Sequence, residues 1–179
     1  MNYTPITLAD NAYEVQEEAR KGGFEDLIGI IQPENVTTYP TFSDETQKAT
    51  GAFVFAAGKK PTAIKCIIEA ISGETKGMGR AALESDFKIT LQNTAENRAL
   101  YNKLRKIRFT AYLKEVEGDG LLLGKPGVTT GYLAHIKDDS YSEKRGEKFN
   151  DARTIEFIIT AKPYGPYEYT ENFSFAAGS

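Results

Sequence analysis

Alternating apolar and polar positions run through the middle and the end of this chain and predict β-strands. Residues 87–91 and 154–161 place apolar side chains at every second position, which is typical of strands with one buried face. Residues 107–116 show the same alternation. The two-glycine turn at 117–120 and the apolar residues 121–123 follow, so the pattern predicts a hairpin there.

Three other segments are less regular. Residues 62–71 are β-branched and apolar with imperfect alternation, which predicts one strand buried on both faces. Residues 130–137 predict the next strand after the hairpin. Near the N-terminus, residues 43–58 predict the start of a helix followed by a strand.

One segment has the pattern of a helix. Asn93 and Thr94 are both suited to the N-cap position, and Leu100 and Leu104 follow at the i, i+4 spacing of one helix face. The sequence therefore predicts a helix over about 94–105. Because its apolar stripe is narrow, we expect this helix to lie on a sheet rather than inside the protein.

A long polar segment, 138–153, separates the last two predicted strands. Connections in hairpins are usually about two to five residues, and longer loops are often functional or disordered. Its acidic and basic side chains nearly balance, which suits a protruding arm that meets a charged partner surface; a surface loop without a role is the alternative. In such an arm, Tyr141 and Phe149 would be apolar anchors, and Arg145 and Lys148 would pair with acidic groups.

These elements predict one domain, residues 1–179. Residues 1–60 are expected to form an N-terminal arm with short elements, 61–161 a β-rich core, and 162–179 an aromatic tail that docks on this chain or on a neighbour. The predicted fold class is α+β, mainly β. We expect an antiparallel β-sandwich or small barrel with one flanking helix at about 94–105, a long inter-strand loop and extended termini.

Composition supports a single folded core in a reducing compartment. Hydrophobic residues make up 40% of the chain and charged residues 26%, as in ordinary globular domains. The N-terminus lacks the basic start and apolar stretch of a signal peptide, and no apolar run reaches the ~20 residues that cross a bilayer. We therefore expect synthesis in the cytoplasm and no membrane span.

Charge argues against tight binding to nucleic acid. The net charge is −3, with 22 basic and 25 acidic residues. Tight binding would require many Lys and Arg side chains that neutralise phosphates. A basic cluster, Lys103, Arg105, Lys106 and Arg108, is better explained as the solvated end of a helix.

Candidate chemistry is sparse, so the sequence predicts no catalytic, cofactor or metal site and no enzyme. Cys66 and His135 are the only cysteine and histidine, and each lies in a predicted apolar strand without an orienting carboxylate nearby in sequence. We interpret Cys66 as a small buried hydrophobe and His135 as a polar residue at a sheet surface. Gly73–Arg80 holds three glycines near two cations but lacks the Gly-Lys-Ser/Thr end of a phosphate-binding loop.

A β-rich chain of this size, with a mid-chain helix, a charged long loop between late strands and an N-terminal arm, resembles tail tube proteins of long-tailed bacteriophages and prophages. In residues 140–151, a glycine, charged residues and an aspartate precede the final strand at Ile155-Glu156-Phe157. A Pro-aromatic segment, Pro163-Tyr164-Gly165-Pro166-Tyr167, follows that strand. The resemblance covers roughly residues 60–170 and lies in the general pattern of residues, not in an invariant motif.

The resemblance implies a β-sandwich with a flanking helix that closes into hexameric rings. Stacked rings, bridged by long loops and terminal arms, would form a conduit for DNA. The partners would be further copies of this chain and other phage tail proteins, with only transient, weak contact with DNA, in a virion assembled after synthesis in the host cytoplasm. A connector, terminator or tail-tip protein is the alternative within this class. A small intracellular ligand-binding or catalytic β-domain is the alternative outside it.

Overall fold

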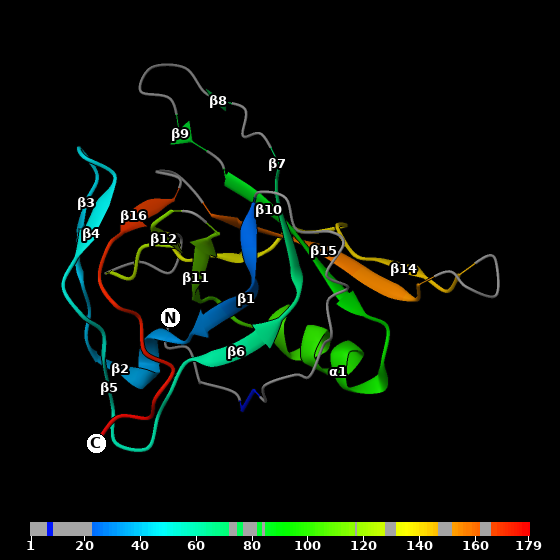
Figure 1. Cartoon of the computed structure of the whole chain (residues 1–179), viewed down its shortest axis with the longest axis horizontal. Helices are drawn as coiled ribbons and strands as arrows, with labels where there is room; N and C mark the ends of the chain where they lie inside the picture. The colour runs from blue at the N-terminus through cyan, green and yellow to red at the C-terminus, as the bar shows by residue number, and fades with distance from the viewer. Residues whose placement is uncertain are drawn as a thin grey trace.

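The computed structural model describes residues 7–8, 23–71, 75–76, 82–83, 85–116, 118–127, 132–146, 152–161 and 166–179. This part of the chain is mainly β, with two sheets that face each other and one α-helix at their side (Figure 1). The predicted class, α+β and mainly β, is confirmed. The described strands form open sheets rather than a closed barrel, so the sandwich is the form that the fold takes.

The larger sheet has seven strands, and all neighbours but one are antiparallel. The exception is the β16–β4 pair, which is parallel. In spatial order the strands are β3 (Thr41–Ser43), β4 (Lys48–Thr50), β16 (Tyr167–Tyr169), β12 (Gly120–Leu123), β11 (Thr110–Glu115), β1 (Phe24–Ile31) and β6 (Thr62–Lys65).

The second sheet has five strands. Its path runs β13 (His135–Ile136), β15 (Thr154–Ala161), β10 (Ser85–Gln92) and β7 (Ile67–Ile71), and β14 (Ser142–Lys144) also pairs with β15. Two short pairs complete the described strands. They are β2 (Val36–Thr38) with β5 (Val54–Phe55), next to the 3-10 turn Pro33–Asn35, and β8 (Thr75–Lys76) with β9 (Ala82–Leu83).

The main core lies between the two sheets, where the alternating positions of the sequence meet. The predicted inward positions of β10 and β15 are buried, and they pack with inward residues of β1, β6 and β11. The largest contributors are Ile28, Ile30, Ile64, Phe87, Ile89, Leu91, Phe109, Leu113, Ile155, Phe157 and Ile159. The alternation predicted for residues 87–91, 107–116 and 154–161 is thus confirmed, as is the hairpin of β11 and β12.

Two segments predicted as single strands pass from one sheet to the other instead. Residues 62–65 belong to the larger sheet and 67–71 to the smaller one, and between them the amide of Cys66 donates to the carbonyl of Asp26 at 3.0 Å. In the segment predicted as a strand at 130–137, Ala134 bridges to Phe109, and only β13 pairs with β15. Apolar residues are buried on either side of such a crossover, so the pattern alone does not reveal it.

Helix α1 (Ala95–Leu104) confirms the predicted helix and its cap. The Thr94 hydroxyl accepts a hydrogen bond from the amide of Asn97 at 3.2 Å, which satisfies one of the free amides of the first turn. Leu100 and Leu104 are buried in the main core, while most of the helix surface faces outward. The helix therefore closes one side of the sandwich with a narrow apolar stripe.

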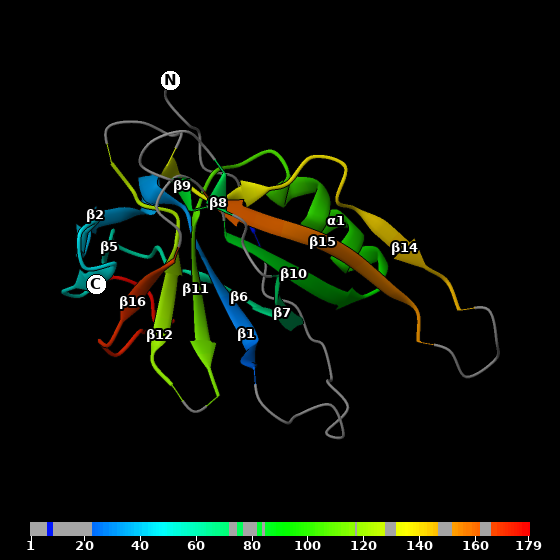
Figure 2. The ribbon, with the colours of Figure 1, turned by 90° about the horizontal axis from the view of Figure 1, so that it is seen from above.

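The C-terminal tail docks on its own chain within the described residues. Strand β16 joins the larger sheet, and the Tyr167 hydroxyl donates to Asp44 at 2.6 Å. Beyond it, the Phe173 ring stacks on Tyr112 at 4.2 Å and covers Gly29, where a Cβ would lie 3.1 Å from that ring. The tail thus covers the outer face of the larger sheet (Figure 2).

The N-terminal region contributes more to the core than the sequence predicted. Strand β1 lies between β11 and β6 in the larger sheet, so the core begins before residue 61. The helix start predicted within 43–58 is wrong. Residues 44–47 form a turn between β3 and β4, with Gln47 at a positive φ of 55°. Residues 12–21, whose sequence favours a short polar helix, lie outside the described residues.

Candidate functional site

The largest hollow that we describe lies between α1 and the segment that connects β13 to β14. Its volume is about 1040 Å³, and we call it the α1 groove. The groove joins the two features that the sequence singled out, the basic end of the helix and the polar arm. It is lined by Arg98, Tyr101, Asn102, Arg105, Lys106, Ile136, Lys137, Asp138, Asp139, Tyr141 and Glu143.

One wall of the groove is a wide bulge in the smaller sheet. Strands β13 and β14 both pair with β15, and residues 137–141 leave the ladder between them. The amide of Lys137 donates to the carbonyl of Ile158 at 2.8 Å, and the Ser140 hydroxyl accepts from the amide of Ile158 at 3.1 Å. Asp139 takes a positive φ of 59°, a conformation that aspartate tolerates better than most residues. The bulge turns Asp138 and Asp139 outward.

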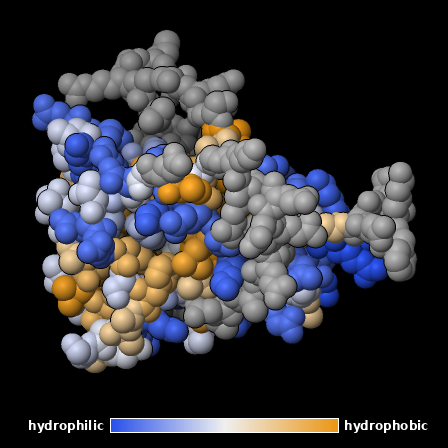
Figure 3. Space-filling view, viewed as in Figure 1, coloured by the Kyte–Doolittle hydropathy of each residue, from blue (hydrophilic) through white to orange (hydrophobic). Residues whose placement is uncertain are grey.

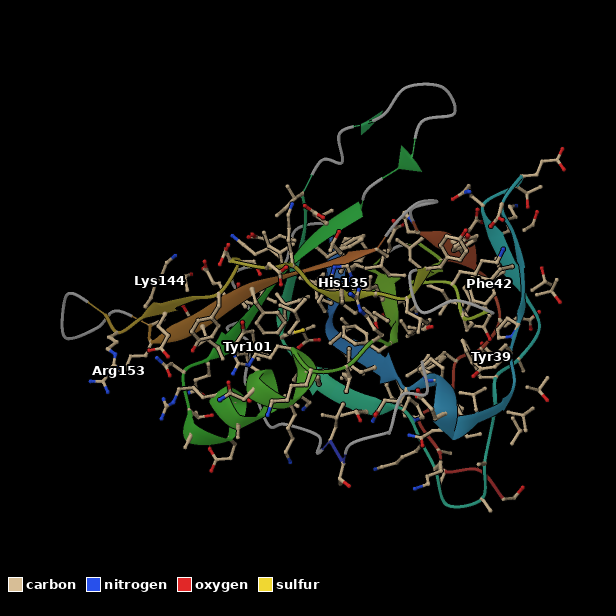
Figure 4. All side chains as sticks on the ribbon, turned by 180° about the vertical axis from the view of Figure 1, so that it is seen from behind. Tyr39, Phe42, Tyr101, His135, Lys144 and Arg153 are labelled. Carbon is tan, nitrogen blue, oxygen red and sulfur yellow. The ribbon has the colours of Figure 1, made fainter. Side chains whose placement is uncertain are left out.

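A tyrosine pair joins this bulge to the helix. The rings of Tyr101 and Tyr141 stack with centroids 4.3 Å apart, and Tyr101 also contacts Phe157 at 5.3 Å. Figure 4 shows Tyr101 reaching from α1 toward β15. The groove therefore has an aromatic side that continues into the main core.

A short chain of polar contacts fixes the start of the arm. The Tyr141 hydroxyl donates to Glu143 Oε1 at 2.5 Å, and Arg145 Nη2 lies 3.3 Å from Glu143 Oε2. Burial, followed by the hydrogen bond to Glu143, raises the pKa of Tyr141 to about 12. The same hydrogen bond, with the nearby Arg145 guanidinium, lowers the pKa of Glu143. At neutral pH the contact is thus a neutral phenol donating to a carboxylate.

Charges on the two walls of the groove differ in sign. The helix side carries Arg98, Arg105 and Lys106, whereas the bulge side carries Asp138, Asp139 and Glu143 beside Lys137. Of the basic cluster predicted as a solvated helix end, Arg105 and Lys106 line the groove and Lys103 does not. The arrangement can hold a partner that offers both signs of charge.

The described part of the predicted arm contains a strand, and the arm's candidate residues separate into two groups. Residues 142–144 form β14, which follows the bulge and pairs with β15. Tyr141 packs inside the chain, while the Arg145 side chain is 83% exposed. Lys148 and Phe149 lie outside the described residues. Lys144 and Arg153 extend away from the sandwich on the hairpin of β14 and β15 (Figure 4).

Cys66 and His135 lie on different sides of the smaller sheet. Cys66 is fully buried in the main core, and this burial raises the pKa of its thiol. Ile136 belongs to that core, so its neighbour His135 points to the opposite face of β13, where it pairs with Thr160. The fold does not bring the two side chains together as a dyad.

Among the described residues, no three His, Cys, Asp or Glu side chains gather as they would around a metal ion. Nor does any helix of this part combine the length and hydropathy that crossing a bilayer requires. Most of the glycine-rich segment 73–80 lies outside the described residues.

Exposed apolar side chains mark two places that the sequence pattern did not indicate. Val54 is 50% exposed beside the C-terminal segment, and apolar residues gather on that face over β2 and β5 (Figure 3). Val116 is 47% exposed at the turn between β11 and β12. The sequence pattern predicted both Val54 and Val116 as ordinary strand residues. Only their positions at the ends of strands could have suggested that their side chains are exposed.

The role of Tyr101 was also missed, because nothing in the sequence pairs it with a residue of the arm. Comparison of the chain with protein families, with curated proteins and with solved structures gave no match.

Proposed function

We propose that this chain is a structural subunit of a phage virion, most specifically a tail tube subunit that assembles into stacked hexameric rings around a path for DNA. The observation that carries the proposal is the hairpin of β14 and β15, which projects from a two-sheet sandwich flanked by one helix (Figure 2). The resemblance, which covers roughly residues 60–170, implies this combination of sandwich, helix and late arm.

The distribution of contact surfaces supports assembly. The α1 groove, which includes the start of the arm, belongs to a different part of the fold from the Val116 turn and from the apolar face near Val54. A stacked ring needs contacts within a ring and between rings, made by different surfaces of the same chain. Lys144 and Arg145 extend far into solvent, with side chains 64% and 83% exposed, as a bridging element requires.

The charges agree with a conduit that does not retain DNA. The chain carries a net charge of −3, and the α1 groove mixes both signs. Binding to phosphates depends on clustered cations that release counterions. We expect duplex DNA to bind more weakly than about micromolar at physiological salt. Tighter binding would instead favour a nucleic-acid-binding function at the basic end of α1.

Electron microscopy of the purified full chain, with its mass measured by light scattering, tests the proposal. Six-fold rings that stack into tubes are the expected result. Single rings that never stack would favour a connector, terminator or tail-tip role. A uniform monomer would overturn the assembly proposal. If a small molecule then raised its melting temperature, the α1 groove would become the candidate site of a ligand-binding domain.

A further inference from the structure

Val116 and Asp119, which lie in the segment between β11 and β12 that we call the tip, offer an apolar and an acidic side chain to a neighbouring molecule. Val116 is 47% exposed at the end of the hairpin, and its amide is held by the carbonyl of Gly23 at 3.0 Å. Glu115 and Asp119 flank it and are exposed. In an interface, burial of the exposed Val116 side chain would remove its apolar surface from water, which is favourable.

The α1 groove offers the complementary features. Its aromatic side, formed by Tyr101 and Tyr141, can cover an aliphatic side chain. Its helix wall presents Arg105 and Lys106 to carboxylates.

A single chain cannot satisfy this match by itself. The chain enters β11 shortly after α1 ends, and the tip lies at the other end of that strand. Six residues of strand at about 3.3 Å each separate the two ends by roughly 20 Å. Figure 2 accordingly shows α1 and the end of the β11–β12 hairpin on opposite sides of the molecule.

We infer that the β11–β12 tip of one copy inserts into the α1 groove of the next copy, with Val116 on the tyrosine pair and Asp119 facing Arg105. This inference rests on the proposed self-assembly and names one of its interfaces. Tip and groove are different surfaces, so the contact is heterologous and every copy keeps one of each for a further neighbour. Tyr141 belongs both to this interface and to the predicted arm, whereas Arg145 does not line the groove.

The test reverses one charge on each side. Arg105→Glu places like charges opposite each other at every interface, as does Asp119→Arg, and each variant alone should assemble at least ~tenfold more weakly. When the two variants are mixed in equal amounts, they can alternate along an assembly. Each groove that carries Arg105→Glu then receives a tip that carries Asp119→Arg, and each unaltered groove receives an unaltered tip. The mixture should recover assembly, and so should the double variant.

Matched controls exclude a general effect of charge. Lys103→Glu makes the same change on the same helix outside the groove, and Glu45→Lys changes an exposed turn of another hairpin. Both should assemble like the unaltered protein. Val116→Ser leaves every charge in place and should also weaken assembly, while thermal unfolding verifies that each variant is folded.

The outcomes separate this inference from the proposed function. If the unaltered chain assembles and the two charge variants assemble equally well, the tip-and-groove contact is wrong and the structural role stands. If both variants lose assembly and their mixture does not regain it, the pairing of Arg105 with Asp119 is wrong. An unaltered chain that stays monomeric overturns both proposals.

Discussion

The ring of Tyr141 stacks on that of Tyr101 with centroids 4.3 Å apart, and both partly buried side chains pack against the main core. This contact ties the beginning of the arm to α1. The Tyr141 side chain, which the sequence suggested as an anchor for a partner, is thus held in place within the monomer. The hairpin of β14 and β15 therefore leaves the sandwich from a fixed base.

Replacing Tyr141 should separate the contribution of the stacked ring from that of its hydroxyl. Tyr141→Ala removes both the stack and the hydrogen bond to Glu143, and we expect a loss of about 2 kcal/mol in the free energy of unfolding. Tyr141→Phe keeps the ring and should cost less than about 1 kcal/mol. Urea unfolding monitored by circular dichroism measures both. Equal losses in the two variants would show that the stack contributes little.

High pH should destabilise the fold through buried tyrosines. Burial is the main reason that the pKa of Tyr141 and that of Tyr169 are each raised to about 12 from the ordinary 10.0. A raised pKa means that the folded state holds the proton more tightly, so this stabilisation is complete below pH 10 and is lost as pH rises toward 12. The melting temperature should fall across that window. The double variant Tyr141→Phe, Tyr169→Phe should show a shallower fall, and an equally steep fall would contradict the assignment.

Gly124 is expected to tolerate no side chain, because its backbone has a φ of +94° and a Cβ would lie 2.4 Å from the amide nitrogen of Ala134. That amide is bonded to Phe109, so the neighbour cannot move aside cheaply. Gly124→Ala should lower the free energy of unfolding by about 2 kcal/mol or more. Gly127→Ala is the matched control, since its Cβ meets nothing within 4 Å, and it should change stability by less than about 0.5 kcal/mol. Similar losses in both variants would refute the steric explanation.

The strands were predictable where one face of a strand is buried and the other is not. In β10 and β15, the apolar residues at every second position enter the core, so the period of two is visible in the sequence. They are Phe87, Ile89, Leu91, Ile155, Phe157 and Ile159. The helix was predictable for a similar reason, since Thr94 caps it and Leu100 and Leu104 form its buried stripe. In these elements local preference and tertiary burial agree.

The crossovers were not predictable, because burial on both sides hides a change of sheet. Ile64, Cys66 and Ile68 are all buried, yet they belong to two sheets and the corner between them. Strand β1 was also underestimated, since its neighbours Ala111 and Leu113 come more than eighty residues later. The α1 groove depends on similar long-range contacts. The sequence marked Arg105 and Tyr141 separately but held no signal that places them around one hollow.

Shortening the arm tests its predicted role in assembly without disturbing its base. Replacing residues 146–151 by Gly-Ser-Gly removes Lys148 and Phe149 but keeps Tyr141, the pairing of β14 with β15, and the bond from the Asn93 amide to the Arg153 carbonyl. Because closure entropy depends only weakly on loop length, unfolding stability should change by less than about 0.5 kcal/mol. If the arm bridges neighbouring copies, light scattering should show that large particles are lost while the monomer stays folded.

Charge reversal at the base of the arm gives an independent measure of the same role. Arg145→Glu changes a side chain that is 83% exposed, so a structural effect on the monomer should be small. If Arg145 pairs with an acidic group on a neighbour, the variant should assemble less well, and assembly of the unaltered chain should weaken as salt screens that pair. Lys59→Glu reverses another exposed charge, far from the arm in sequence, and serves as the control. Assembly that is indifferent to the shortened arm, to Arg145→Glu and to salt would leave the hairpin as a surface feature, and the tube would have to be held together elsewhere.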